Sequence, residues 1–325
     1  MNYSRFEPFK VLAQYDKLVE LSRGNICTPK QLMVYPANTC NLNCGHCIMR
    51  ELRADNCKLP KETLHKLVKD CIRLGIKLVN IAGGGEPLTN MHTFEFIQML
   101  HKAGIQVALN TNGLELLETL PVDYLRISVD AASRETYKKV KGVDGWDRLN
   151  SKLTQYKKHG ELGLAFLLTH ENYQEVDEFC RWAQQFDYDF IHIRPAYWPK
   201  YDEKIKVAVA EVMTIAEQLK ALYRNVNIRL DKFDSHWKQR EFSKCRATCL
   251  KAVLTADGSF IQCQDKFTKF GNYNEQSFED IWYSQQHRDI IDKNDLNTCP
   301  RCVEGPTNEI IEHCVMGDSL KINLF

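Results

Sequence analysis

The most informative segment of the chain is Leu32-Met-Val-Tyr-Pro-Ala-Asn-Thr-Cys40-Asn-Leu-Asn-Cys44-Gly-His-Cys47. It begins with an apolar run of strand length, and three cysteines follow within one short loop. Three thiolates on such a loop can converge on one cubic iron–sulfur cluster and leave its fourth iron without a protein ligand. An iron with a free position can bind a small chelating cofactor.

Five further apolar runs with strand-like composition follow this first one. They lie at residues 78–82, 105–109, 124–129, 163–168 and 190–193. The segments between them, such as residues 60–74 and 93–103, repeat apolar residues at helical spacing. Helical crossovers between strands imply a parallel sheet, and six such units predict an α/β fold, a partial (β/α)6 barrel. Functional side chains are then expected at the carboxyl ends of the strands.

The pattern changes after residue 199. We expect a long amphipathic helix over residues 203–223, a short strand over 226–230, and a β-hairpin formed by 252–255 and 259–262 with its turn at Asp257-Gly258. A further helix is expected over residues 278–292. We therefore divide the chain into an N-terminal extension (1–30), a barrel core (31–232) and a small cysteine-rich hairpin and helix domain (233–325), with the boundary near 232–243.

Composition limits the class of protein and its partners. The 43 basic and 42 acidic residues leave a formal charge of +1, so nucleic acid is an unlikely partner. Charged residues interrupt the first ten positions and no apolar stretch is long enough to span a membrane, so we expect a cytoplasmic protein without a membrane partner. In a reducing compartment, the 13 cysteines are better interpreted as metal ligands and buried thiols than as disulfides.

The spacing of Cys40, Cys44 and Cys47 resembles the signature of the radical S-adenosylmethionine (radical SAM) superfamily. His46 stands where that family usually has an aromatic residue, and we assign it to the cofactor-binding set. The resemblance implies a [4Fe–4S] cluster held by the three cysteines and S-adenosylmethionine bound at its open iron. A zinc knuckle or three structural thiols is the alternative, although structural zinc sites favour four ligands.

The turn Gly83-Gly84-Gly85-Glu86 after the second strand resembles the methionine-binding turn of this family. The glycines would let the backbone approach the cofactor, and Glu86 would accept the ammonium of its methionine group. An ordinary turn is the alternative.

The fourth strand resembles the ribose-contacting strand of the family, with Ser128 and Asp130 as its polar groups. Capping of the next helix is the alternative for this pair. Asn110 and Asn112 close the third strand and match ligand-contacting positions, although both residues are also common in turns. Arg194 ends the sixth strand, where it would meet a carboxylate or form a structural ion pair.

The C-terminal cysteines form a second set that resembles the SPASM/twitch extension of radical SAM enzymes. Its members are Cys245, Cys263, Cys299 and Cys302. The thiols are fewer than the full SPASM form needs, so we favour the twitch form with one auxiliary cluster, which makes two [4Fe–4S] clusters in all. A structural zinc ribbon is the alternative.

Cys249 and Cys314 remain outside these sets. Cys249 is an alternative ligand to Cys245, or a hydrogen-atom donor to a substrate radical, or a buried inert thiol. The role of Cys314 stays open.

The resemblance implies an enzyme that reductively cleaves S-adenosylmethionine to a 5′-deoxyadenosyl radical and abstracts hydrogen from its substrate. Peptide-modifying members often carry a leader-recognition domain, for which the 30 residues before Gln31 are too few. We therefore expect a small polar substrate (a sugar, aminocyclitol or nucleotide), oxidised or epimerised by an oxidoreductase or epimerase. The electron donor would be an external flavodoxin or ferredoxin, and residues 194–201 would line the substrate pocket or pack as a surface loop.

Other classes remain as alternatives. They are a peptide maturase that forms a crosslink or epimer on a peptide presented by a partner, a nucleic-acid-modifying radical SAM enzyme, and a non-catalytic iron–sulfur or zinc scaffold.

Overall fold

The computed structural model describes residues 8–196, 203–229, 240–299 and 302–316. Seven of its strands run parallel to their neighbours. They are β1 (Gln31–Val34), β2 (Leu78–Ile81), β3 (Gln106–Thr111), β4 (Tyr124–Ser128), β5 (Glu161–Leu168), β6 (Phe190–Pro195) and β7 (Val226–Ile228). All six strands expected for the barrel and the short strand after them are therefore confirmed.

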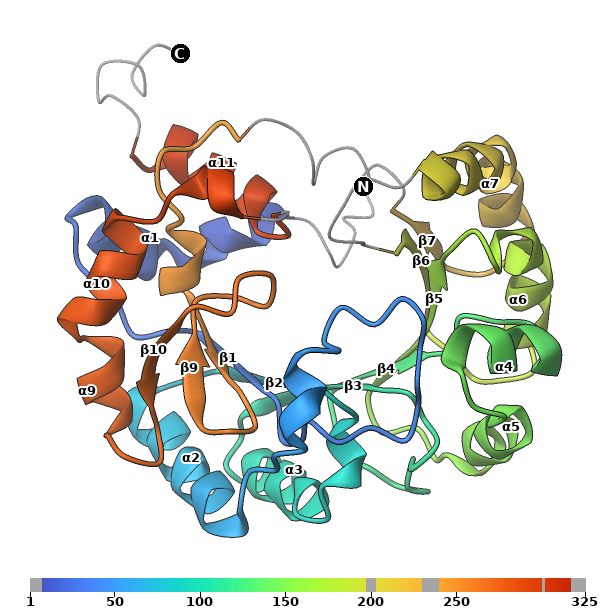
Figure 1. Cartoon of the computed structure of the whole chain (residues 1–325), viewed down its shortest axis with the longest axis horizontal. Coiled ribbons are helices and arrows are strands. Elements are labelled where there is room, and N and C mark those ends of the chain that lie inside the picture. The colour runs from blue at the N-terminus through green and yellow to red at the C-terminus, as the bar shows by residue number, and fades with distance from the viewer. Residues whose placement is uncertain (1–7, 197–202, 230–239, 300–301, 317–325) are drawn as a thin grey trace.

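Helices connect most of these strands and cover the outer face of the curved sheet (Figure 1), whereas a loop without a helix joins β3 to β4. They are α2 (Lys61–Leu74), α3 (Thr93–Lys102), α4 (Arg134–Lys141), α5 (Trp146–Gln155), α6 (Val176–Ala183) and α7 (Glu203–Leu222). Helix α2 illustrates how the sequence pattern specifies a helix: it buries Leu64, Leu67 and Cys71 on one face and ends at Gly75, whose φ of 67° suits the left-handed C-terminal position. The predicted partial barrel is confirmed.

Alternation along the strands separates an apolar outer face from a polar inner one. On β4, Leu125 and Ile127 are buried in the main core, whereas Arg126 and Ser128 line a cavity inside the sheet. A period of two follows from the pleat of a strand. The polar residues interspersed in these apolar runs therefore mark the interior of the barrel.

The C-terminal region extends the same sheet. Strands β8 (Lys251–Leu254), β9 (Ser259–Ile261) and β10 (Lys269–Asn272) give the order β10-β9-β8-β1-β2-β3-β4-β5-β6-β7. Strands β8 and β9 form the expected antiparallel hairpin, and β8 pairs in parallel with β1. The predicted boundary at 232–243 falls largely on residues outside the described part, and hydrogen bonding joins the core and the cysteine-rich region into one sheet.

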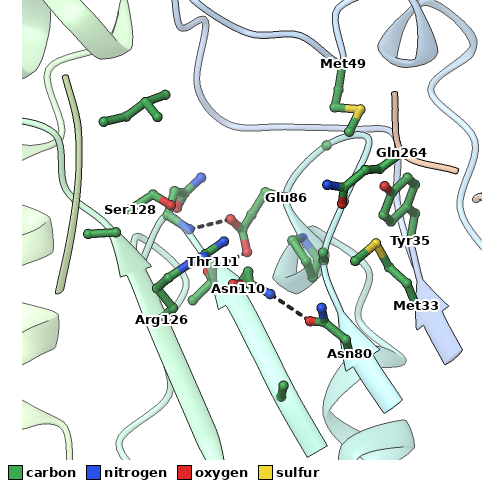
Figure 2. Close-up of a pocket in the computed structure, with 18 of the residues that line it drawn as sticks. Met33, Tyr35, Met49, Asn80, Glu86, Asn110, Thr111, Arg126, Ser128 and Gln264 are labelled. Carbon is green, nitrogen blue, oxygen red and sulfur yellow. Dashed lines mark hydrogen bonds between the residues drawn. The ribbon is translucent and has the colours of Figure 1, made fainter. Parts of the chain in front are cut away.

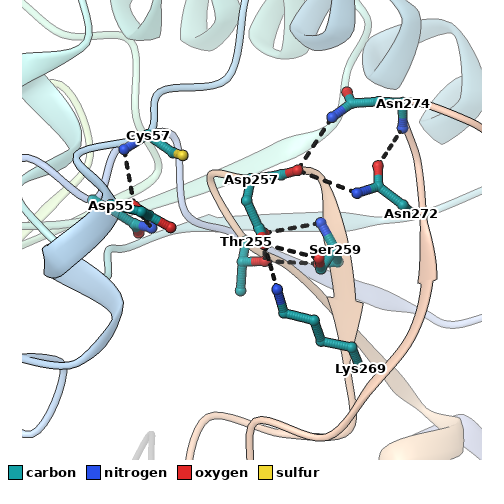
Figure 3. Close-up of polar contacts among 9 residues, drawn as sticks. Asp55, Cys57, Thr255, Asp257, Ser259, Lys269, Asn272 and Asn274 are labelled. Carbon is teal, nitrogen blue, oxygen red and sulfur yellow. Dashed lines mark hydrogen bonds and ion pairs between the residues drawn. The ribbon is translucent and has the colours of Figure 1, made fainter.

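The hairpin turn is fixed by Asp257 (Figure 3). Its carboxylate accepts hydrogen bonds from the Thr255 hydroxyl at 2.5 Å and from the Ser259 hydroxyl at 2.9 Å, and pairs with the Lys269 ammonium at 2.6 Å. Gly258 follows with a φ of 83°, which an L-residue with a side chain adopts only under strain. The turn predicted from Asp257-Gly258 is therefore confirmed.

The helix expected over residues 278–292 is two helices, α9 (Phe278–Trp282) and α10 (Gln285–Asp292). The break occurs at Ser284, whose hydroxyl accepts a hydrogen bond from the His287 N–H and starts a new helix. Further helices are α1 (Tyr15–Ser22) and α11 (Gly305–Cys314). Short 3₁₀ segments are η1 (Pro8–Gln14), η2 (Leu52–Asp55), η3 (Pro87–Thr89), η4 (Tyr173–Glu175), η5 (Ala247–Cys249) and η6 (Leu296–Thr298).

Polar contacts hold the C-terminal region against the core and against the N-terminal extension. The Tyr273 hydroxyl donates to Asp70 on α2 at 2.6 Å, and the Trp282 indole N–H donates to the Cys27 carbonyl at 2.9 Å. In the described part of the chain, no helix combines the length and apolar character needed to cross a bilayer.

Candidate active site

A cavity of about 1020 Å³ lies inside the curved sheet, and its lining comes from strands β1 to β6, β8 and the loop after β1. Cys40, Cys44 and Cys47 all line it. Figure 2 shows part of this lining, with Glu86, Asn110, Arg126 and other polar side chains gathered at neighbouring strands. The structure therefore brings the cysteine loop and the polar inner face of the sheet to one space.

Arginine side chains hold the cysteine loop in place. Arg53 donates to the Leu42 carbonyl at 2.7 Å and its second terminal nitrogen lies 3.9 Å from the Cys47 sulfur. Arg50 donates to the Cys44 carbonyl at 3.0 Å. Burial raises the pKa of the Cys40 and Cys44 thiols. Cationic iron favours the thiolate form of such groups, so the donor set suits a metal cluster.

The cysteine loop supplies three thiols, and a cubane cluster with one open iron takes one thiolate at each of three irons. Among the described residues, no three His, Cys, Asp or Glu side chains are close enough to share one metal ion. A [4Fe–4S] cluster does not need that arrangement, because each thiolate binds a different iron. Cys40, Cys44 and Cys47 would hold the cluster and face the cavity.

The glycine turn after β2 packs directly on the start of the cysteine loop. A Cβ at Gly84 would lie 2.3 Å from the side-chain oxygen of Asn38, and one at Gly85 would lie 2.0 Å from the Thr39 carbonyl oxygen. Gly83 and Gly85 line the cavity and Gly84 does not. Glycine at positions 84 and 85 allows close contact with the loop that carries Cys40, and the cofactor contact that the sequence suggested for this turn stays a prediction.

Glu86 is buried at the base of this turn and is held by three donors. Its carboxylate accepts from the Thr111 hydroxyl at 2.6 Å, the Asn112 backbone N–H at 2.7 Å and the Leu88 N–H at 3.1 Å. Burial raises the pKa of Glu86, and the three hydrogen bonds oppose that rise. A carboxylate has about four acceptor positions. One therefore remains for the ammonium that the sequence assigned to it.

Asn112 links the third strand to the cysteine loop. Its side-chain amide donates to the Asn41 side chain at 2.7 Å, and its own oxygen accepts from the Leu114 N–H at 2.9 Å. Asn110 donates to the Asn80 side chain at 2.7 Å inside the cavity (Figure 2). Asn112 thus positions the loop, and the Asn80–Asn110 pair lies where a ligand can reach it.

Asp130 is committed to a buried ion pair with Lys141, a partner that the sequence did not indicate. The Oδ2 atom that pairs with Lys141 also lies 3.8 Å from Nε2 of His46. The other oxygen, Oδ1, accepts from the Leu167 N–H at 2.7 Å. Burial alone would raise the pKa of Asp130, but Lys141 together with the other groups around the carboxylate outweighs burial, so the pKa is lowered. Burial lowers the pKa of His46 to about 4, so its imidazole is neutral at pH 7.

Asp130, Lys141 and His46 all line the cavity, as does Ser128. The helix cap that was the alternative for Ser128 and Asp130 is supplied by Ser133, whose hydroxyl accepts from the Thr136 N–H. Ser128 therefore stays available for the predicted ribose contact. Asp130 joins the end of β4 to Lys141 of α4, and its own predicted ribose contact stays a prediction.

The second cysteine set adjoins the same cavity. Cys245 accepts a hydrogen bond from the Asn308 side chain at 3.6 Å. Burial raises the pKa of Cys263 and of Cys302 to about 12 in each case, and the nearby Cys245 sulfur contributes to both shifts. Gln264 and Val303, the residues after Cys263 and Cys302, line the cavity. The set, with Cys299, therefore lies beside the candidate active site, while residues 300 and 301 of the predicted knuckle are outside the described part.

Cys249 does not line the cavity. It is 2% exposed and packs with Cys27, Leu21 and Ile311 in a separate small core beneath the N-terminal helix. This position does not favour hydrogen-atom donation to a substrate in the cavity, and it favours the alternative of a buried packing thiol. Cys314 is exposed at the end of α11.

Sequence reasoning missed Arg126 and Lys141 as residues of the site. The alternation on β4 places Arg126 on the same face as Ser128, which was the signal for the first of them. No local pattern marks Lys141, because its partner belongs to a different element. Arg194 lines the cavity, which its predicted contact with a carboxylate requires. Residues 197–201 of the predicted substrate loop lie outside the described part of the chain.

Two protein families match this chain. The profile of the radical SAM superfamily matches residues 34–183, and that of the SPASM iron–sulfur cluster-binding domain matches residues 245–303. The chain belongs to the radical SAM superfamily. The resemblance inferred from the cysteine spacing is thus confirmed, and the two domains imply [4Fe–4S] clusters and S-adenosylmethionine as cofactors of this radical SAM protein.

Curated relatives carry the name probable GTP 3′,8-cyclase. One from Saccharolobus islandicus is 30% identical over 176 residues, which cover 50% of this chain and 56% of the relative, so the chain matches little more than half of that relative's length. One from Metallosphaera sedula is 27% identical over 286 residues, covering 80% of this chain and 86% of the relative.

Solved structures share the fold of this radical SAM protein. SuiB of Streptococcus suis has a TM-score of 0.64 and 19% identity, covering 90% of this chain and 74% of SuiB. The tagged anSMEcpe with bound AdoMet has a TM-score of 0.62 and 17% identity, covering 86% of this chain and 85% of its own. At such identities the likeness concerns the fold alone.

Proposed function

We propose that this radical SAM enzyme acts on a small polar substrate, a sugar, an aminocyclitol or a nucleotide, and oxidises or epimerises it. The observation that carries the proposal is the cavity that the three cysteines share with Asn80, Asn110, Arg126, Ser128 and Arg194. A volume of about 1020 Å³ is at the upper end of the range for small-molecule pockets, so it suits a cofactor together with a small substrate.

The chain's own residues would position both ligands. When bound, the cluster and S-adenosylmethionine supply a 5′-deoxyadenosyl radical that abstracts hydrogen from a C–H bond. Glu86 would accept the ammonium of the cofactor, and Ser128 would contact its ribose. The buried pair of Asp130 and Lys141 joins the end of β4 to α4, and the Lys141 carbonyl accepts from the Asn43 N–H of the cysteine loop at 2.9 Å, so β4 and the loop would hold one geometry.

Cys245, Cys263, Cys299 and Cys302 would hold an auxiliary [4Fe–4S] cluster beside the cavity. Their proximity to the cavity, through Gln264 and Val303, supports a path for an electron from the substrate side. The donor that reduces the first cluster would be an external flavodoxin or ferredoxin.

Within the small-molecule class, the relatives favour a nucleotide, because their name specifies GTP as the compound that is cyclised. A peptide substrate is the second candidate. The observation that favours it is the shared fold with SuiB, which is also known bound to the precursor peptide SuiA.

The proposal is tested by anaerobic reconstitution with iron and sulfide, followed by dithionite and S-adenosylmethionine. We expect about eight irons per chain and formation of 5′-deoxyadenosine. Cys44→Ala should abolish the product, whereas Cys314→Ser, which changes an exposed thiol outside both sets, should not. An iron content near four per chain would contradict the auxiliary cluster. If the wild type formed no more 5′-deoxyadenosine than Cys44→Ala, the proposed enzymatic activity would be contradicted.

Substrate class is tested by deuterium transfer into 5′-deoxyadenosine. Perdeuterated sugars, aminocyclitols, nucleotides and peptides would be offered in parallel. Transfer from a peptide and from none of the small molecules would replace the first candidate by the second.

A further inference from the structure

Two asparagines and two alanines alternate on the part of the cavity wall that β2 and β3 form. Asn80 on β2 pairs in register with Ala108 on β3, and the next inward-facing positions are Ala82, directly after β2, and Asn110 on β3. All four residues line the cavity, and we call them the amide floor. Because the alanine side chains are short, the space beside the two asparagines belongs to the cavity.

The two asparagines bind each other and keep polar groups for a ligand. The Asn110 amide nitrogen donates to the Asn80 side-chain oxygen at 2.7 Å (Figure 2). A carboxamide carries two N–H donors and one acceptor oxygen. Among the described residues, no group bonds to the Asn80 amide nitrogen or to the Asn110 side-chain oxygen, and both side chains are only half-buried. The pair therefore presents a donor beside an acceptor to whatever occupies the cavity.

The wall around this pair carries no net charge that would select an ionic ligand. Every residue of β2 and β3 that lines the cavity has a neutral side chain. Arg126 on β4 lies opposite Asn110 in the register. The lining also contains two carboxylates near Arg126, since Asp123 directly precedes β4 and Glu161 begins β5. Charges of both signs thus accompany Arg126, and a ligand held by the asparagine pair needs no charge of its own.

The depth of the pair in the cavity suits the substrate better than the cofactor. Asn110 pairs in register with Arg126, which precedes Ser128 by two residues. Asn80 pairs with Ala108, which is two residues deeper again. Two strand residues span about 7 Å and four span about 13 Å, so the pair lies that much further than Ser128 from the strand ends that carry the cysteine loop. A substrate bound beneath the cofactor, whose predicted ribose contact is Ser128, would reach it.

We propose that Asn80 and Asn110 bind an uncharged edge of the substrate that offers an acceptor beside a donor. Neighbouring hydroxyls of a sugar or aminocyclitol have this chemistry, because each hydroxyl donates and accepts, and so does the edge of a nucleobase. The inference rests on the proposed function and deepens it, since it names the group that is recognised and the two side chains that recognise it. A ligand without this edge would leave the amide groups unpaired, which makes the pair selective.

The test uses the anaerobically reconstituted chain with S-adenosylmethionine and without reductant, so that the probes do not compete for an empty cofactor site. The probes are myo-inositol, hypoxanthine and cyclohexanol, and the last of these offers a single hydroxyl. Ligand-observed NMR titration measures their affinities. The variants are Asn80→Ala and Asn110→Ala. The matched control is Asn227→Ala, which changes an asparagine of β7 that does not line the cavity.

We expect myo-inositol or hypoxanthine to bind the wild type and the Asn227→Ala control equally well, and to bind about tenfold or more tightly than cyclohexanol. The affinity for the preferred probe should fall by about tenfold in each asparagine variant, because a hydrogen bond is lost and its partner stays unpaired. The preferred probe identifies the source of the edge. Ala108→Leu fills the space beside the asparagines and keeps both amides, so it should also weaken binding and serves if an asparagine variant does not fold.

Equal affinity of the wild type and all three variants, or no binding of either polar probe to the wild type, would overturn the assignment. Equilibrium dialysis should show that Asn80→Ala keeps its affinity for S-adenosylmethionine, and a tenfold loss would overturn the assignment in favour of a cofactor contact. Formation of 5′-deoxyadenosine after addition of dithionite separates these outcomes from failure of the proposed function. Probe binding lost in the asparagine variants, with no cofactor cleavage by the wild type, would refute the enzyme and leave the binding pair standing.

Discussion

The buried ion pair between Asp130 and Lys141 gives a direct prediction about stability. The side chains of Asp130 and Lys141 are 3% and 2% exposed, so Lys141→Met leaves a buried carboxylate without its counter-charge. Removing one partner of a buried pair costs about 3–5 kcal/mol. For a chain of 325 residues, each kcal/mol corresponds to about 1.5 °C, which predicts a melting temperature about 4–7 °C lower.

The assay is thermal unfolding followed by circular dichroism under anaerobic conditions at pH 7. Lys139→Met is the matched control, because Lys139 lies on the same helix α4 and is exposed. The double variant Asp130→Asn/Lys141→Met should recover part of the loss, since asparagine removes the charge and its oxygen can still accept from the Leu167 N–H.

The pH dependence follows from the lowered pKa of Asp130. A carboxyl group whose pKa is lowered by folding stabilises the folded state at pH values above its pKa in the unfolded chain. That stabilisation is lost as the pH falls through its pKa in the folded chain. The gap between wild type and Lys141→Met should therefore narrow below about pH 4. The reasoning is refuted if Lys141→Met has the same melting temperature as the Lys139→Met control at pH 7. It is also refuted if the double variant is no more stable than Lys141→Met.

Three further predictions concern the site and the hairpin. Glu86→Gln should weaken S-adenosylmethionine binding by about tenfold or more without changing the iron content, because glutamine has no anionic acceptor for the ammonium. Equilibrium dialysis measures the affinity and iron analysis the iron content. An unchanged affinity would contradict the role of Glu86. Asp257→Asn should lower the free energy of unfolding by about 1–2 kcal/mol after allowance for solvent screening, because Lys269 and other partners lower the pKa of Asp257 to about 2 against the effect of its burial. Urea unfolding should show that the wild type loses this stability as the pH falls from about 4 to about 2. A difference in unfolding free energy between the two proteins that does not change with pH would count against the prediction. Arg53→Met should lower the midpoint potential of the cluster held by Cys40, Cys44 and Cys47, because it removes an N–H group near the Cys47 sulfur. Spectroelectrochemistry measures the shift. An unchanged potential would mean that Arg53 only supports the loop.

Local patterns in the chain determine much of the architecture. The apolar runs predicted the parallel strands because a strand's side chains alternate and its length is limited. The Asp257-Gly258 turn predicted the hairpin because glycine tolerates positive φ. The break between α9 and α10 was missed, although Ser284 carried the capping signal for it.

The spacing of Cys40, Cys44 and Cys47 within one loop was enough to indicate the family, which is confirmed, and to predict the three cluster ligands. The partners of Asp130 and Glu86, the burial of Cys249 and the pairing of β8 with β1 became visible only in the folded chain. These features depend on contacts between residues far apart in the chain. A periodic pattern specifies which face a side chain occupies, but the opposing group is set by how the elements pack.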